Sequence, residues 1–156
     1  MISILIVTSI SFGGVAYADS GTDGSGSEVT FAGGSGTETD PYIIETAEQL
    51  DAVRNNLRAS YRLNADIEFT EADFAEGGKF YNEGKGWEPI GASYSFSFKG
   101  TFDGNGHVIR NLIIKSTGDY AGLFGWCSSN AKLIDIGIEN GEINAESVSC
   151  VGDSIL

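Results

Sequence analysis

His107, the only histidine, is the first residue whose chemistry has to be considered. It follows the turn-type residues Asp103-Gly104-Asn105-Gly106, and its imidazole could pair with the Asp103 carboxylate. General base catalysis would also need a nucleophile and an oxyanion donor, but the chain has neither a G-x-S-x-G nor an H-E-x-x-H motif. We therefore expect His107 to occupy a turn or strand position, and we predict no catalytic residue.

Carboxylates are the next candidates, because sugar-cleaving sites combine acids with lysine or arginine on one exposed face. An acidic run is formed by Asp66, Glu68, Glu71, Asp73 and Glu76. The bases lie in other segments, at Lys99, Arg110, Lys115 and Lys132. A solvated acidic face is therefore favoured over an active site or calcium site. The acidic, glycine-rich residues 19–36 also fail the EF-hand pattern, so no cofactor is predicted and calcium is the only candidate ion.

Aromatic side chains could bind a ligand by stacking if their rings face outward. The candidates for such stacking are Trp87, Trp126 and Tyr94, and Phe96 and Phe98 alternate with polar residues beside Tyr94. Alternating aromatic residues more often pack inside a domain, with tryptophan as the best exception. A core role is therefore favoured, and a sugar-stacking platform is the alternative.

The 156-residue chain has 9 bases, 22 acids and a formal net charge of −13, which excludes a basic nucleic-acid binder. None of this charge lies in residues 1–18, where an apolar run precedes the signal-peptidase pattern Ala16-Tyr17-Ala18. The run is shorter than the roughly 20 residues that span a bilayer. We expect a signal peptide at 1–18, a flexible Gly/Ser-rich linker at 19–36, and a secreted or cell-surface protein without a membrane span in the mature chain.

One helix is predicted near the start of the remaining chain, residues 37–156. Thr46 begins a capping box in which Gln49 reaches back to the backbone of the N-cap residue. Leu50, Val53 and Leu57 follow at helical spacing over about three turns. These residues should form one apolar stripe that packs on the core.

Strands are predicted for most of the remaining chain. Polar and apolar residues alternate over 61–69 and again over 94–102, and 108–114 is a second apolar run. Residues 70–86, which lie between the first two of these segments, are polar and glycine-rich, which is typical of a surface loop.

An internal repeat links two apolar runs. Residues 109–114 and 133–138 share one pattern, with Asn111 and Asp135 at the same position, and their offset is 133 − 109 = 24. Such a period indicates a solenoid, and the strand pattern makes a β-solenoid the natural form. Asn111 and Asp135 should lie at corners, because these residue types tolerate left-handed backbone.

Three blocks that follow one another along the chain, within 33–50, 98–112 and 120–125, resemble those of bacterial surface and secreted repeat proteins. The third block, with Gly122-Leu123-Phe124-Gly125, is similar to the GLUG motif of adhesin-like proteins, which also occurs beside immunoglobulin-A-cleaving metallopeptidase domains. The resemblance covers roughly residues 33–151. It implies a mainly β fold, a right-handed parallel β-helix with one N-terminal capping helix. It does not imply catalysis, since the GLUG unit is a structural repeat.

The end of the sequence suggests a partial repeat. Cys150-Val151-Gly152 could align with Tyr120-Ala121-Gly122 as the start of another unit. Because solenoids need a terminal cap, we expect 37–156 to be truncated at its C-terminus and to pack against further coils of a longer parent chain.

The leading functional hypothesis is a non-catalytic exported bacterial surface segment, structural or adhesin-like. Glycans and host or cell-surface proteins are the expected partners, and nucleic acid is not. The alternatives are a carbohydrate-binding module, or the N-terminal part of a secreted peptidase or polysaccharide-degrading enzyme whose catalytic domain is missing.

A disulfide between Cys127 and Cys150 is predicted if these residues lie on neighbouring coils. They are 150 − 127 = 23 positions apart, close to the repeat offset, and adjacent strands bring Cα atoms within disulfide range. Thiol titration of the unreduced, denatured protein should therefore find no free thiol. Two free thiols would show that the cysteines miss each other.

Overall fold

The structure is a computed structural model that describes residues 29–115 and 120–144. The helical elements are α1 (Ala47–Asp51), the 3-10 helix η1 (Ala52–Asn55), α2 (Glu71–Phe74) and the 3-10 helix η2 (Asn82–Gly84). The strands are β1 (Tyr42–Ile44), β2 (Ser60–Leu63), β3 (Ile67–Glu68), β4 (Thr101–Asp103), β5 (Val108–Arg110), β6 (Ile113–Lys115), β7 (Lys132–Ile134), β8 (Gly137–Glu139) and β9 (Glu142–Asn144).

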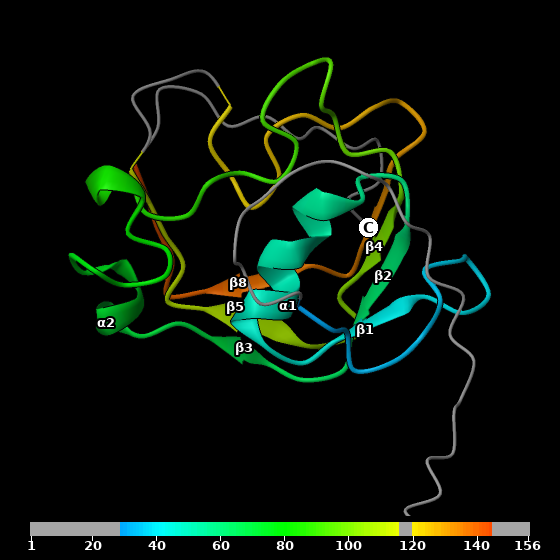
Figure 1. The fold of residues 1–156 in the computed structure, drawn as a ribbon, viewed down its shortest axis with the longest axis horizontal. Coiled ribbons are helices and arrows are strands. Elements are labelled where there is room, and N and C mark those ends of the chain that lie inside the picture. The colour runs from blue at the N-terminus through cyan, green and yellow to red at the C-terminus, as the bar shows by residue number, and fades with distance from the viewer. Residues whose placement is uncertain (1–28, 116–119, 145–156) are drawn as a thin grey trace, which may run out of the picture.

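These strands form three small sheets, and every pairing between them is parallel. The sheets have the orders β1-β2-β4-β7, β3-β5-β8 and β6-β9. In Figure 1, the sheet that contains β1, β2 and β4 and the sheet that contains β3 and β5 lie along different sides of the molecule. From β4 onwards the chain visits the three sheets in turn, with β4, β5 and β6 and then β7, β8 and β9, whereas β1 and β2 join the same sheet one after the other.

Parallel pairing places side chains of one kind above each other and builds the core from continuous rows. Tyr61 pairs with Phe102, and Ile67 pairs with Ile109. All four side chains are buried, with exposed fractions of 2% or less. The apolar residues at the inward positions of the strands are thus removed from water, as is typical of parallel sheets. The aromatic row continues outward from Tyr61 to Tyr42, whose ring stacks on Phe31 at a centroid distance of 4.6 Å.

Helix α1 begins at the predicted N-cap. The Thr46 hydroxyl accepts a hydrogen bond from the Gln49 backbone N–H at 3.3 Å, which confirms the cap. The Gln49 side chain accepts from the Glu45 backbone N–H at 2.7 Å, one residue before the predicted partner. The helix is also shorter than predicted, since it changes to η1 at Ala52, while Leu50 and Val53 are fully buried in the core.

Asparagine and aspartate residues turn the chain at the ends of strands. Asn111 and Asp135 have φ angles of 58° and 54°, so their predicted left-handed corner positions are confirmed. The predicted turn after Asp103 is also left-handed, with a φ of 52° at Asn105. The Asn105 and Asn111 amides donate to the carbonyl oxygens of Leu63 and Phe69, both at 3.1 Å. These two hydrogen bonds therefore also connect each turn to an earlier part of the chain, at the end of β2 and just after β3.

The predicted right-handed parallel β-helix with one N-terminal capping helix is wrong. The described residues form three separate sheets of four, three and two short strands, with no closed solenoid, and they contain a second α-helix, α2. The intervals between stacked positions are unequal: Tyr42 to Tyr61 is 61 − 42 = 19 residues, and Tyr61 to Phe102 is 102 − 61 = 41. The strands β1, β2 and β4 therefore do not follow one regular repeat.

Two further sequence predictions differ from the structure. The repeat offset of 24 is wrong, because Ile109 of β5 pairs with Ile138 of β8, which is 138 − 109 = 29 positions later. The alternation over 94–102 does not form one strand, since Tyr94 and Phe96 point to solvent and β4 begins at Thr101. Periodicity alone could not distinguish a loop from a strand at 94–102, because an exposed aromatic loop and a half-buried strand show the same alternation.

Several predictions fall on residues outside the described ranges. The signal peptide at 1–18 and Cys150 lie there, so the leader and the Cys127–Cys150 disulfide stay predictions. Of the linker at 19–36, residues 29–36 are described, and Gly33 forms an antiparallel bridge with Ile43. Among the described residues, no helix has the length and apolar character needed to cross a membrane.

The stacked rows predict a sharp difference between two isoleucines of the same row. Ile109 is fully buried, whereas its pairing partner Ile138 is 38% exposed. Ile109→Ala should lower the free energy of unfolding by about 2–5 kcal/mol, and Ile138→Ala by about 1 kcal/mol or less. Urea unfolding of both variants tests this, and equal losses would contradict the described burial of the row.

Candidate ligand-binding site: an exposed aromatic surface

Two loops, residues 90–98 and 123–128, are joined by a ladder of backbone hydrogen bonds. The bonds run from the N–H of Ile90 to Leu123 O (3.0 Å), Gly125 to Ile90 O (2.8 Å), Trp126 to Gly91 O (2.7 Å), Phe98 to Trp126 O (2.7 Å) and Ser128 to Phe98 O (2.8 Å). Each loop thereby satisfies the polar backbone of the other, which fixes both in place.

Gly91 is required where the loops approach most closely. Its φ is +79°, and a Cβ atom at this position would lie 2.4 Å from the Trp126 carbonyl oxygen and 3.0 Å from the Phe98 nitrogen. A side chain here would therefore push apart the two shortest hydrogen bonds of the ladder, which both involve Trp126.

Four aromatic residues on or beside these loops form what we call the aromatic surface: Tyr94 and Phe96 of the first loop, Trp126 of the second, and Tyr120, which precedes the second loop. Tyr94, Phe96 and Tyr120 are 79%, 69% and 39% exposed, and Trp126 is half-buried. The Trp126 ring lies between two tyrosines, with centroid distances of 5.7 Å to Tyr94 and 4.5 Å to Tyr120. These contacts orient the indole without covering it.

The aromatic surface rests on the core. Phe98 and Phe124, one from each loop, are buried with their ring centroids 4.9 Å apart, and the Phe124 ring also lies 5.2 Å from that of Phe102 of β4. The motif residues Gly122, Leu123, Phe124 and Gly125 are all buried here. Their place in the structure is therefore under the aromatic surface, where they position it.

The three residues predicted to stack on a ligand have different positions. Tyr94 and Trp126 belong to the aromatic surface, but Trp87 is only 1% exposed. The Trp87 indole N–H donates to the Leu123 carbonyl oxygen at 3.2 Å, and the Arg54 guanidinium lies 5.4 Å from its ring centroid. Both faces of Trp87 are thus in the protein interior. The sequence predicted a role for Tyr120 only within the GLUG-like block at 120–125, because its spacing is the same for an exposed tyrosine as for a buried one.

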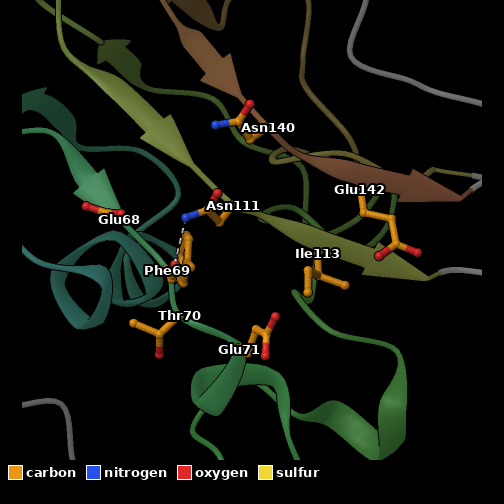
Figure 2. Close-up of a pocket in the computed structure, with 8 residues that line it drawn as sticks. All are labelled: Glu68, Phe69, Thr70, Glu71, Asn111, Ile113, Asn140 and Glu142. Atoms are coloured by element: carbon orange, nitrogen blue, oxygen red, sulfur yellow. Dashed lines mark hydrogen bonds between the residues drawn. The ribbon is translucent and has the colours of Figure 1, made fainter.

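The predicted acidic run is divided among different structural roles. Glu68 and Glu71 line a cleft of about 430 Å³ together with Glu142, and Figure 2 shows these carboxylates spread around it. Asp73 instead closes the capping box of α2 by accepting from the Thr70 backbone N–H at 2.8 Å. Within residues 29–115 and 120–144, no group of three or more acids, histidines or cysteines could hold a metal ion.

Asp66 of the same run organises an ion-pair cluster beside β5. Its carboxylate accepts from the Arg110 guanidinium at 2.7 Å and from the Val108 backbone N–H at 3.2 Å, and it lies 3.2 Å from His107 Nδ1. His107 therefore pairs with Asp66, whereas Asp103 binds Arg62 at 3.0 Å. The hydrogen bond from Arg110 is the main cause that lowers the pKa of Asp66 to about 2.

A second cleft, of about 270 Å³, lies over β2, β4 and β7, and its charged residues are paired. Lys132 binds Glu38 at 2.8 Å across the cleft, and this hydrogen bond lowers the pKa of the Glu38 carboxyl. Arg62 and Asp103, paired as described above, also line it. These charges are thus engaged with each other on the protein surface.

Comparison with known proteins finds similarity to large proteins, and no family model matches the chain. This chain is 38% identical over 135 residues to a protein of Evansella cellulosilytica named "Putative Gly-rich membrane protein". It is 35% identical over 127 residues to halomucin of Haloquadratum walsbyi. The matches cover 85% and 78% of this chain but only 15% and 1% of the relatives. This chain therefore spans a small part of the length of each.

One solved structure is similar in fold and sequence. It is named as a putative immunoglobulin A1 protease from Bacteroides ovatus, with a TM-score of 0.57 and 29% sequence identity. The similarity covers 74% of this chain and 31% of that protein.

The Asp66 cluster predicts a pH-dependent contribution to stability. The pKa of Asp66 is lower in the folded protein, about 2, than its usual value of 3.8, so its contribution to stability is full above about pH 4 and is lost as the pH falls towards 2. Asp66→Asn should therefore be less stable than the wild type near neutral pH, and the difference should vanish near pH 2. Urea unfolding at several pH values measures this. A constant difference across the range would contradict the assignment.

Proposed function

We propose that this chain is a non-catalytic segment of a secreted or cell-surface protein and acts as an adhesin-like module. The observation that carries the proposal is the aromatic surface, in which two hydrogen-bonded loops and the adjacent Tyr120 present four rings that are exposed or half-buried. The Trp126 ring contacts the rings of Tyr94 and Tyr120, and exposed apolar side chains gathered in this way mark contact with another molecule. The scaffold beneath it then serves to position the rings.

The names of the relatives support a place at the cell surface. One relative is named as a membrane protein, and the match to it covers 85% of this chain. Both relatives are far longer than the part they share with this chain, which supports the role of a module in a larger protein. The resemblance of residues 120–125 to the GLUG motif of adhesin-like proteins supports the same role.

A second candidate is a segment of a secreted peptidase, supported by the similarity to the Bacteroides ovatus structure. In that case the catalytic groups would belong to another part of a longer protein. The chain has one histidine and neither a G-x-S-x-G nor an H-E-x-x-H motif, which supports a non-catalytic role for this segment. Incubation of the purified chain with immunoglobulin A1 should give no cleavage, and peptide fragments on a gel would overturn the non-catalytic assignment.

The adhesin-like role predicts that the aromatic surface mediates attachment. Beads coated with the purified chain should bind to intact bacterial or epithelial cells more than beads coated with the Tyr94→Ser/Phe96→Ser variant. Both side chains are more than two-thirds exposed, so the variant should fold. Flow cytometry measures bead binding. An Ile134→Ser variant, changed at a 47% exposed residue of β7, is the matched control and should bind like the wild type.

A further inference from the structure

The aromatic surface is electrically neutral on a strongly acidic molecule. Residues 89–98 and 120–131, which contain all four rings, have no Asp, Glu, Lys or Arg, although the whole chain carries a net charge of −13. A charged ligand would lose hydration here without gaining an ionic partner. The composition therefore favours an uncharged ligand.

Small polar side chains lie beside the rings. Ser95, Ser129 and Asn130 are exposed in the same two segments, and Tyr94 and Tyr120 add hydroxyl groups. Together they offer both donors and acceptors of hydrogen bonds. The surface thus combines flat apolar faces with neutral polar groups at their edges.

We propose that the aromatic surface binds a neutral glycan. A pyranose ring has an apolar C–H face that can stack on an aromatic ring, and hydroxyl groups around its edge that can bind serine, asparagine and tyrosine. This inference rests on the proposed adhesin-like role and names the ligand class of the same site. Tyr94 and Phe96 supply the most exposed faces, and Trp126 supplies the central ring.

The charge pattern favours a sugar over a protein partner or a second copy of the chain. Aromatic side chains are also enriched at protein interfaces, so the rings alone do not separate these ligands. A second copy of the chain would bring the same strongly acidic molecule against this one, whose net charge is −13, and the two would repel each other. A neutral sugar meets no such repulsion.

The loops are also organised before any ligand arrives. The backbone ladder between residues 90–98 and 123–128 fixes the position of Trp126, and the turn before Phe96 is closed by its N–H donating to the Ser93 carbonyl oxygen at 3.1 Å. Binding therefore needs little ordering of the backbone, which lowers the entropic cost of association.

A glycan array of neutral oligosaccharides, with uronic acid and sialylated glycans as charged controls, tests the proposal on the purified chain. We expect binding to one or more neutral glycans and weaker or no binding to the charged ones. Titration calorimetry with the best neutral glycan should show that Tyr94→Ala and Trp126→Ala each lower affinity about 2- to 10-fold. Tyr94→Phe should keep most of the affinity, because stacking needs the ring.

Three results would overturn the proposal: no neutral glycan bound, preference for charged glycans, or affinity unchanged in Tyr94→Ala. Ile134→Ala, at an exposed apolar residue outside the two loops, is the control and should bind normally. Circular dichroism identifies any variant that fails to fold, and Tyr94→Ala, at a 79% exposed position, is the variant that decides. If no glycan binds but bead attachment still depends on Tyr94 and Phe96, the ligand class is wrong and the adhesin-like role stands.

Discussion

The register of the parallel strands is the constraint on which the rest of the structure depends. Each pairing places one apolar side chain over another, as with Tyr61 over Phe102 and Ile67 over Ile109, so a slip of one residue would turn a whole row towards solvent. The strands are only two to four residues long, and the backbone must therefore turn sharply at their ends. Left-handed Asn111 and Asp135 provide these turns without shifting the register.

The aromatic surface depends on the same rows. Phe102 of β4 contacts Phe124, and Phe124 contacts Phe98, so the base of the two loops is continuous with the core of the largest sheet. The loops contain only isolated bridges, and their order comes from the backbone ladder and this aromatic base. The outward rings are thus supported by inward ones, which explains how an irregular segment can present a fixed surface.

Local signals in the sequence were sufficient for local features. The Thr46 cap, the alternating burial of Tyr61 and Leu63, and the left-handed corner at Asn111 each depend on a few neighbouring residues, and the structure contains all three. The regular solenoid failed because the lengths of the intervening loops are set by tertiary packing, and a similar six-residue pattern can recur in different sheets. Leu133 lies in the sheet of β4, whereas Ile109 lies in that of β5.

The candidate site was only partly predictable for a related reason. Tyr94, Trp126 and Trp87 have equivalent chemistry, and their exposure depends on long-range contacts such as the bond from Trp87 to Leu123. The two tryptophans consequently lie in opposite environments, one sealed in the core and one near solvent between tyrosines. Their fluorescence should differ in wavelength and in access to a soluble quencher. The native chain therefore carries two optical reporters, so that an event on its surface can be distinguished from loosening of its interior without any added label.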